Sequence, residues 1–369
     1  MTRVVLAPDS FKGTITAADA AAALAHGWAA VDPDAEFVLR PMADGGEGTV
    51  AAFEAAVPGA RRMPVAVEGP AGAVVGSFWL LLPPTEDAPE GTAVVDLGST
   101  SGIELLDELR PWDADTTGLG QAMAAALDHG VSRLVVGIGS SASTDGGTGM
   151  LAALGARFLD AAGGPVAPGA RGLADIAAVD LTALRAAPEV RVLTDVTNPL
   201  IGPRGAAAVF GPQKGLRAAE DIALVDEGLR RLADLLGLDA ALPGSGAAGG
   251  TGGALVVWGG VLAPGAAAVA ELIGLTDAIA DADVVITGEG SYDGQSGDGK
   301  VPSFLASLAA DAGAGAMLAA GRIADDADMT PFAASASLTA LAGSAEAALA
   351  EPARWLREAG AVLARAAAS

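Results

Sequence analysis

The sequence predicts an α/β protein of two domains, and three observations point to that fold class. Its 369 residues exceed the length of one typical domain, about 100 to 200 residues. Short β-branched runs alternate with alanine-rich, helix-compatible runs, which is typical of parallel sheets. Glycine-rich loops follow several of these strands, where α/β folds place their ligand sites. We therefore expect functional loops at the carboxyl ends of parallel strands.

The first strand, loop and helix set this rhythm. Residues 4–7 form a β-branched run, and Thr16-Ala17-Ala18-Asp19 matches the capping box that opens a helix. Three later runs, residues 36–40, 133–138 and 283–287, predict strands with a loop and a helix behind each of them. Toward the C-terminus we expect strands at 317–320 and 337–341 and one amphipathic helix over 345–367.

Residues 63–97 break the alternation. Three strand-like runs, PVAV, VVGSFWLLL and TAVVDL, are separated there by Gly-Pro and Pro-Pro turns, which is typical of a meander. The chain returns to helix near residues 264–276. This pattern predicts a discontinuous outer domain, residues 1–62 plus 275–369, and an inserted mixed α/β domain, residues 63–274.

The amino-acid composition argues against several classes of function. The net charge of −24 repels nucleic acid and anionic membrane surfaces, so we expect neither as a partner. The chain has no cysteine and two histidines, which argues against a zinc hydrolase or a Ser-His-Asp triad. The apolar run 4–8 is too short for a signal peptide. The uncharged stretch 240–270 is rich in glycine and predicts a loop with a short buried element, so we expect a cytoplasmic protein.

The three lysines are the first candidates for binding. The chain has 21 lysine and arginine residues in total, and all except three are arginine. Lys12, Lys214 and Lys300 each lie beside glycine in a predicted loop. An ammonium group is a compact charge that the arginine fork does not replace at a crowded phosphate. We interpret the lysines as phosphate ligands or catalytic cations; a chance surface position is the alternative.

The first acidic loop is DGGEGT at residues 44–49. It follows a strand and precedes a helix, so its backbone N–H groups and carboxylates can hold phosphate and magnesium together. Asp44 is a candidate catalytic carboxylate, Gly45 and Gly46 are candidate binding residues, and Glu47 is a candidate metal ligand. An acidic helix cap is the plainer interpretation.

The second loop, GIGSSASTDGG at residues 137–147, offers hydroxyls, N–H groups and one carboxylate after a buried strand. It predicts a phosphate cradle in which Gly139, Ser140, Ser141 and Gly146 bind the ligand. Asp145 is a second candidate for the catalytic carboxylate. The same hydroxyls could instead form an elaborate helix cap.

The third loop, TGEGSYDGQSGDGK at residues 287–300, fits G-x-x-x-x-G-K near its end. Val301 stands where a P-loop requires Ser or Thr, so we expect an anion-binding loop rather than a P-loop NTPase. Glu289 and Asp293 could supply the metal contacts, and Lys300 a catalytic charge. Gly288 and Gly290 are candidate backbone ligands.

The segment LTDVTNPLIGPRG ends another buried strand. Asp195 would lie at the carboxyl edge of that strand, where it could ligate metal or activate a hydroxyl, although an Asx-turn at Asn198 is equally compatible. Arg204 and Lys214 would add positive charge. A rival motif, GSGAAG at 244–249, fits a dinucleotide fingerprint but lacks a preceding strand.

Five long motifs, in this order, resemble those of the bacterial type I glycerate kinases across essentially the whole chain. They are APDSFKGTITA from Ala7, PMADGGEGT from Pro41, GIGSSASTDGGTGM from Gly137, LTDVTNPLIGPRGAAAVFGPQKG from Leu193 and VITGEGSYDGQSGDGKVP from Val285.

The resemblance implies ATP-dependent phosphorylation of D-glycerate with Mg²⁺, with 2-phosphoglycerate as the expected product. It implies a flavodoxin-like domain and a second α/β domain, with the active site in the cleft between them. It also adds Ser10, in the first motif, to the binding residues.

The motifs depart from the family pattern at four places. Ser140 stands where glycine is expected, Thr144 where asparagine is expected, Thr197 where aspartate is usual, and Ser291-Tyr292 where an Arg-Leu pair is usual. Loss of a cation at Ser291 leaves a related hydroxy acid open as substrate. An NAD-dependent dehydrogenase of a small hydroxy acid and a non-catalytic nucleotide-binding sensor are the alternatives that the sequence leaves open.

Overall fold

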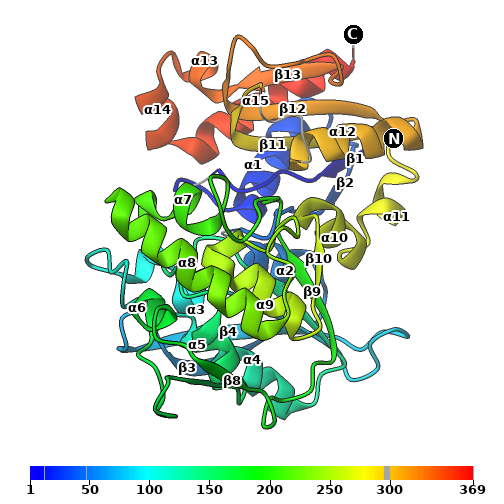
Figure 1. Ribbon diagram of the computed structural model, residues 1–369. Coiled ribbons are helices and arrows are strands. Elements are labelled where there is room, and N and C mark those ends of the chain that lie inside the picture. Colours follow the sequence, from blue (N-terminus) through cyan, green and yellow to red (C-terminus); the bar gives the residue numbers. More distant parts are fainter. Residues whose placement is uncertain (12, 47, 295–299, 369) are drawn as a thin grey trace. The chain divides into compact units, whose positions relative to one another are not determined.

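The computed structural model describes residues 1–368 except 12, 47 and 295–299. The chain forms two compact units (Figure 1). Unit 1 comprises Met1–Pro58 and Pro264–Ser369, and unit 2 comprises Gly59–Ala263. Each unit combines a sheet with helices, which confirms the predicted α/β class with a parallel and a mixed sheet. The boundaries expected from the sequence, after residues 62 and 274, stay a prediction of where the domains separate as folding units.

Unit 1 is built on a sheet in the order β13-β12-β11-β1-β2, within the part of the chain that the structure describes. Its neighbouring strands pair in parallel. The strands are β1 (Arg3–Leu6), β2 (Glu36–Leu39), β11 (Val284–Tyr292), β12 (Gly315–Ile323) and β13 (Ala334–Ser337). Because the strands are parallel, their carboxyl ends all lie along the same edge.

Helices cover this sheet. They are α1 (Ala17–Ala29), α2 (Thr49–Ala56), α10 (Gly265–Leu272), α11 (Leu275–Ile279), α12 (Val301–Ala312), α13 (Leu338–Ala342), α14 (Ala345–Ala350) and α15 (Pro352–Ala367). Alternate residues of β1, Val4 and Leu6, pack in one buried cluster with Trp28 of α1 and Leu363 of α15. The period of two in a strand therefore separates the apolar residues of the two faces.

The predicted opening of α1 is confirmed. Thr16 is its N-cap, and the Thr16 side chain accepts a hydrogen bond from the Asp19 backbone N–H at 3.1 Å. The helix packs closely on α15 because two contact positions are glycine. A Cβ on Gly27 would lie 1.9 Å from the Arg357 carbonyl oxygen, and one on Gly360 would lie 2.2 Å from that of Leu24.

Three expectations for unit 1 were wrong in detail. Strand β11 continues to Tyr292, so the first part of the third loop is strand. The last strand ends at Ser337, whose side chain caps α13, so residues 338–341 are helical. The C-terminal helix is two helices, because Pro352 lacks an N–H and begins a new helix.

Unit 2 contains a mixed sheet in the order β10-β9-β6-β5-β4-β3 and a two-stranded sheet of β7 and β8, among the described residues. The strands are β3 (Arg61–Glu68), β4 (Val74–Leu82), β5 (Thr92–Asp96), β6 (Arg133–Gly137), β7 (Arg157–Leu159), β8 (Ala178–Asp180), β9 (Glu189–Leu193) and β10 (Val261–Ala263). Strands β3, β4 and β5 pair antiparallel, as the predicted meander requires. Within the mixed sheet the pairing from β5 onward is parallel, whereas β7 and β8 pair antiparallel.

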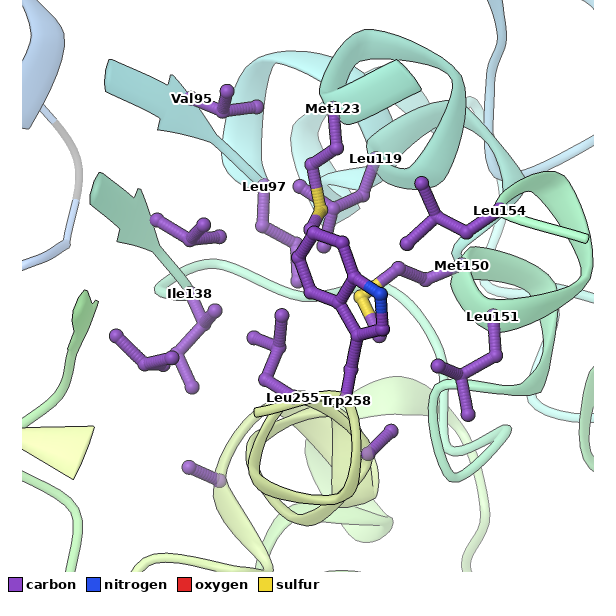
Figure 2. Close-up of a cluster of buried hydrophobic side chains, with 14 of the residues drawn as sticks. Val95, Leu97, Leu119, Met123, Ile138, Met150, Leu151, Leu154, Leu255 and Trp258 are labelled. Atoms are coloured by element: carbon purple, nitrogen blue, oxygen red, sulfur yellow. The ribbon is translucent and has the colours of Figure 1, made fainter. Parts of the chain in front are cut away.

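The helices of unit 2 are α3 (Gly98–Ser101), α4 (Thr117–His129), α5 (Thr148–Ala153), α6 (Gly169–Leu173), α7 (Ala206–Phe210), α8 (Ala219–Leu236) and α9 (Thr251–Val257). Figure 2 shows the core between them and the sheet. The Trp258 ring lies among Leu119 and Met123 of α4 and Met150 of α5. The Trp258 indole N–H donates to the Arg185 carbonyl oxygen at 2.8 Å, which satisfies the polar atom of a buried ring.

The uncharged stretch 240–270 is divided among several short elements. It contains α9, β10 and part of α10, joined by glycine-rich turns, and so holds more regular structure than the loop with one short buried element that the sequence predicted. Among the described residues, no helix combines the length and the apolar character needed to cross a membrane.

Candidate functional site

A cavity of about 510 Å³ opens at the carboxyl edge of the unit 1 sheet. Its polar lining comes from the segments after β1 and β2, from the ends of β11 and β12 and from the start of α12. The apolar lining comes mostly from α13, α14 and the start of α15. The lining residues are Asp9, Ser10, Phe11, Thr14, Asp44, Glu289, Gly290, Ser291, Asp293, Lys300, Gly321, Arg322, Leu338, Thr339, Ala345, Ala348, Leu349 and Pro352.

The segment after β1 places Asp9 and Ser10 in this lining. The Asp9 backbone N–H donates to the Gly288 carbonyl oxygen at 2.8 Å, which extends the pairing of β1 with β11 beyond the strand. The Ser10 N–H donates to Asp9 Oδ1 at 2.6 Å. The Asp9 side chain is therefore held against the sheet edge, and the residue is only 8% exposed.

The segment after β2 orients Asp44. Asp44 Oδ1 accepts from the Gly46 N–H at 2.9 Å, and Thr49 Oγ1, at the start of α2, donates to the Gly46 carbonyl oxygen at 2.8 Å. A Cβ on Gly265 would lie 1.7 Å from the Asp44 carbonyl oxygen, so α10 begins directly against this loop. The local turn and the helix together fix the carboxylate at the cavity.

The end of β11 supplies several further lining residues. Glu289, Gly290, Ser291 and Asp293 line the cavity, whereas the Tyr292 side chain packs away from it in a core with Phe332, with 5.6 Å between the ring centroids. Lys300 is the N-cap of α12. Its charge therefore lies where a helix N-terminus also favours anions.

Not every residue predicted for unit 1 lines the cavity. Gly45 and Gly46 lie in the same loop as Asp44 but outside the lining. Gly288 is explained by packing, because a Cβ there would lie 2.1 Å from the Ala319 carbonyl oxygen of β12. Lys12 and Glu47 lie outside the described residues.

In unit 2, Asp145 is fully buried at the centre of a hydrogen-bond network. Its oxygens accept from the Thr116 N–H and hydroxyl, the Ser143 hydroxyl, and the N–H groups of Gly147 and Gly149. A carboxylate held in this way organises the loop between β6 and α5. The geometry is that of a positioning residue rather than of a group that meets solvent or substrate.

Lys214 is buried beside the same loop, with 3% of its surface exposed. Its ammonium group donates to the Ser141 hydroxyl at 3.2 Å and to the Ser143 carbonyl oxygen. Burial lowers the pKa of Lys214 to about 8, while the charge of Asp145 acts in the opposite direction. Lys214 therefore holds the cradle loop from inside.

The remaining cradle residues have distinct environments. Ser140 is exposed and adopts φ = 60°, in the left-handed region. Gly139 precedes it and is half-buried. Gly146 has φ = 66°, and a Cβ there would lie 2.5 Å from Leu232 of α8, so this glycine serves packing. Gly139 and Ser140 are thus the accessible part of the loop, whereas Ser141 is buried and its hydroxyl is bonded to Lys214.

The segment after β9 carries Asp195, which is exposed, and Arg204, also exposed. The Asn198 side chain donates to the Arg204 carbonyl oxygen at 2.8 Å and so closes the turn from Asn198 to Arg204. The rival dinucleotide motif lacks its fold context, because the described residues directly before Gly244 form turns and no strand.

Sequence reasoning missed Asp9 and Arg322. Asp9 stands inside a motif that was recognised, next to Ser10, so its signal was present. No feature of the sequence indicated Arg322, because an arginine at the end of an alanine-rich strand cannot be distinguished from an ordinary exposed charge. The apolar wall from α13 and α14 was equally invisible, since it depends on where those helices pack.

Among the described residues, no three acidic or histidine side chains gather closely enough to hold a metal ion by themselves. The carboxylates of Asp9, Asp44, Glu289 and Asp293 nevertheless line a single cavity. Magnesium usually takes one or two carboxylates, with waters and substrate phosphates completing its shell. The oxygen donors present therefore suit magnesium that arrives with a phosphate ligand.

The fold and this cavity define an α/β protein with a polar cavity at the carboxyl ends of parallel strands, where α/β folds bind their ligands. Comparison with known proteins makes the class specific: a model of the glycerate kinase family matches residues 4–368. The chain belongs to the glycerate kinase family, and it is an enzyme of the kinase class. The resemblance inferred from the five motifs is confirmed.

Several relatives support this assignment. The chain is 39% identical over 320 residues to a glycerate kinase of Bacillus subtilis strain 168, covering 83% of this chain and 81% of the relative. It is 39% identical over 318 residues to the glycerate 2-kinase of Escherichia coli strain K12, covering 83% and 82%. A solved structure from Salmonella typhimurium LT2 that carries the name glycerate kinase 2 matches with a TM-score of 0.86 and 37% identity, over 99% of this chain and 97% of that one.

Proposed function

We propose that the chain transfers the γ-phosphoryl group of ATP to the 2-hydroxyl of D-glycerate, with Mg²⁺. The observation that carries this proposal is the unit 1 cavity, whose lining includes Asp44, Glu289, Asp293 and Lys300. The choice of the 2-hydroxyl is supported by the relative named glycerate 2-kinase. Because ATP is a cytoplasmic metabolite, the cytoplasmic location expected from the sequence belongs to the same proposal.

In this reaction the 2-hydroxyl oxygen bonds to the γ-phosphorus, and the bond from that phosphorus to the bridging oxygen of ADP breaks. The hydroxyl proton passes to a carboxylate. Of the two candidates, Asp44 lines the cavity and Asp145 is buried in its own network. We therefore assign proton acceptance to Asp44 and a positioning role to Asp145.

Lys300 neutralises charge on the transferred phosphoryl group. Such transfers depend mainly on positioning and on charge stabilisation, and little on covalent chemistry. Ser10 and Gly290, both in the lining, are proposed ligand contacts, with Gly45, Gly46 and Gly288 as backbone support. Lys12 remains a catalytic candidate from the sequence alone.

The metal would be held by Glu289 and Asp293, whose carboxylates lie at the cavity. Bound magnesium supplies charge neutralisation at the phosphates. Glu47 stays a metal candidate from the sequence, and Asp195 remains a candidate at the end of β9 in either of its predicted roles. Each of these carboxylates is testable by substitution with its amide.

The candidate binding residues of unit 2 form a second group. We propose that the buried Asp145 and Lys214 hold Gly139, Ser140 and Ser141 in the conformation that binds a substrate anion, with Gly146 allowing the loop to pack on α8. Arg204 is an additional candidate cation. The support is the network of hydrogen bonds around Asp145 and Lys214.

The test is an ADP-release assay with ATP, Mg²⁺ and a panel of small hydroxy acids, followed by phosphorus NMR of the product. We expect release that depends on D-glycerate and a phosphate resonance of 2-phosphoglycerate. A 3-phosphoglycerate resonance would contradict the regiochemistry. ATP binding with no turnover of any acid would instead favour the nucleotide-binding sensor.

A further inference from the structure

Arg322 is a cation at the cavity that the proposed reaction leaves without a role. It is the penultimate residue of β12, it is exposed, and it lines the cavity. Lys300 and Arg322 are the cationic lining residues in the part of the chain that the structure describes. They are the two described positive groups that this cavity offers to an anionic ligand.

The strand register places Arg322 beside Ser291. Ser291 of β11 pairs with Arg322, and Tyr292 pairs with Ile323. Tyr292 is 2% exposed and packs in a buried cluster with Leu318 and Ala320, with Ile323 against it. Ser291 and Arg322, which are neighbours on the two strands, both line the cavity, whereas Tyr292 does not.

The backbone beneath Arg322 is held firmly. The Thr339 hydroxyl of α13 donates to the Gly321 carbonyl oxygen at 2.8 Å. A Cβ on Gly321 would lie 2.4 Å from the Gly290 carbonyl oxygen, so β11 and β12 approach closely at this point. Arg322 thus projects from a fixed strand end, and its long side chain can reach into the cavity.

The charges around Arg322 leave its guanidinium open to a ligand. Several arginines elsewhere in the chain pair with acidic side chains, as Arg133 does with Glu189 at 2.9 Å. Within the described residues, by contrast, Arg322 makes no ion pair or side-chain hydrogen bond, although carboxylates line the same cavity. A guanidinium binds carboxylates and phosphates through two parallel hydrogen bonds.

We propose that Arg322 binds an oxyanion of a substrate, either the carboxylate of the hydroxy acid or a phosphate of the nucleotide. This inference rests on the proposed function. Because Ser291 is the register partner of Arg322 on the adjacent strand, an arginine placed at position 291 would present the same charge to the same part of the cavity.

The experiment compares wild type, Arg322→Ala and the double variant Ser291→Arg/Arg322→Ala. Arg357, an exposed arginine of α15 outside the cavity lining, provides the matched control Arg357→Ala. Steady-state KM values for D-glycerate and for ATP are measured separately, together with calorimetric binding of each ligand and the Tm of each variant.

We expect Arg322→Ala to raise one KM about 10- to 100-fold, as loss of a charged hydrogen-bond pair does, with Tm unchanged. A rise for D-glycerate assigns the carboxylate, and a rise for ATP assigns the phosphates. The double variant should recover at least part of that loss, which a purely structural role of Arg322 would not allow. Arg357→Ala should behave as wild type.

Equal KM values and equal ligand affinities in wild type and Arg322→Ala would overturn the inference while leaving glycerate phosphorylation intact. If wild type binds a ligand but shows no turnover, the proposed function fails. The calorimetric comparison of wild type and Arg322→Ala then still decides the role of Arg322. Binding of neither ligand by wild type overturns both.

Discussion

Lys300 combines two sources of positive potential at one point. It lines the unit 1 cavity and is the N-cap of α12, so its ammonium group adds to the field of twelve helical residues. A compact ammonium can approach a phosphate oxygen from a crowded side, whereas the planar guanidinium of arginine needs more room. The lysine itself, rather than a positive charge in general, is therefore the expected requirement.

Lys300→Arg should lower kcat at least tenfold, and Lys300→Met should lower it roughly 100- to 1000-fold, the loss typical of a removed transition-state contact. Neither change should shift Tm by more than about 2 °C, since Lys300 begins a helix at the edge of a cavity. Steady-state kinetics with thermal unfolding measures both. Full turnover by Lys300→Arg would show that charge alone suffices.

Asp115 is a buried carboxyl in unit 2 whose environment disfavours ionisation. Desolvation, with the charge of Asp145 adding to it, raises the pKa of Asp115 to about 6 from an ordinary value of 3.8. Between these values the folded chain holds a proton that the unfolded chain has lost. The free energy of unfolding therefore falls as pH rises through this window. The destabilisation by the ionised Asp115 carboxylate is fully present above pH 6.

Asp115→Asn removes this titration while leaving an oxygen to accept the Thr117 N–H, now bonded at 2.8 Å. We expect the variant to be more stable than wild type at pH 8 by on the order of 1–3 kcal/mol, with an advantage about 1 kcal/mol smaller at pH 5. Urea unfolding at the two pH values is the measurement. An advantage that does not grow with pH would contradict the raised pKa.

Single residues show how far sequence reasoning reaches. Asp44, Glu289 and Lys300 could be selected because acidic and basic residues among glycines are unusual after strands. The burial of Asp145 and Lys214 could not be predicted, since their partners are distant in the sequence. Asp145 is bonded by Thr116, and Lys214 donates to the Ser143 carbonyl oxygen. A motif indicates that residues matter without showing which ones face the ligand.

The loop between β6 and α5 departs from ordinary backbone geometry at a residue that carries a side chain. Ser140 has φ = 60°, a conformation that costs a residue with a side chain roughly 1 kcal/mol. The expectation of glycine at this position thus has a physical basis. The serine hydroxyl, exposed beside the buried network, is the compensating feature that a ligand could use.

Ser140→Gly should stabilise the protein by about 0.5–1 kcal/mol through relief of this backbone strain, raising Tm by a degree or more. Ser140→Ala is the matched variant, because it removes the hydroxyl and keeps the side chain in the same backbone conformation. It should leave Tm close to wild type. If alanine stabilises as much as glycine, the strain is not the cause; a KM increase shared by both variants would assign a ligand contact to the hydroxyl.

Elements were predicted well where hydrophobic period and caps agree. Thr16 and Asp19 define the start of α1, and the runs before each glycine-rich loop are strands. The errors have local causes. Gly288 and Gly290 read as loop residues, yet both belong to β11, where glycine permits close approach of β12. Pro352 is a typical first residue of a helix, but the amphipathic period continues across it, so the sequence predicted one helix where there are two.

At the scale of the whole molecule, the discontinuous organisation follows from how the sheet of unit 1 is assembled. Strands β1 and β2 come from the N-terminal segment, whereas β11, β12 and β13 come from the C-terminal segment. Residues from the two ends of the chain thus meet at one edge, as Asp9 does with Gly288. The order of the motifs predicted this edge of the sheet. It did not predict the apolar helices that complete the cavity.

The most direct test of the account is the kcat of Asp44→Asn in D-glycerate-dependent ADP release. Asparagine keeps the oxygen that accepts the Gly46 N–H, so the loop and Tm should be preserved while the proton acceptor is lost. The account predicts a fall in kcat of roughly 100- to 10,000-fold at unchanged Tm. Turnover equal to that of wild type would show that the strand-end cavity of unit 1 is not where Asp44 serves phosphoryl transfer.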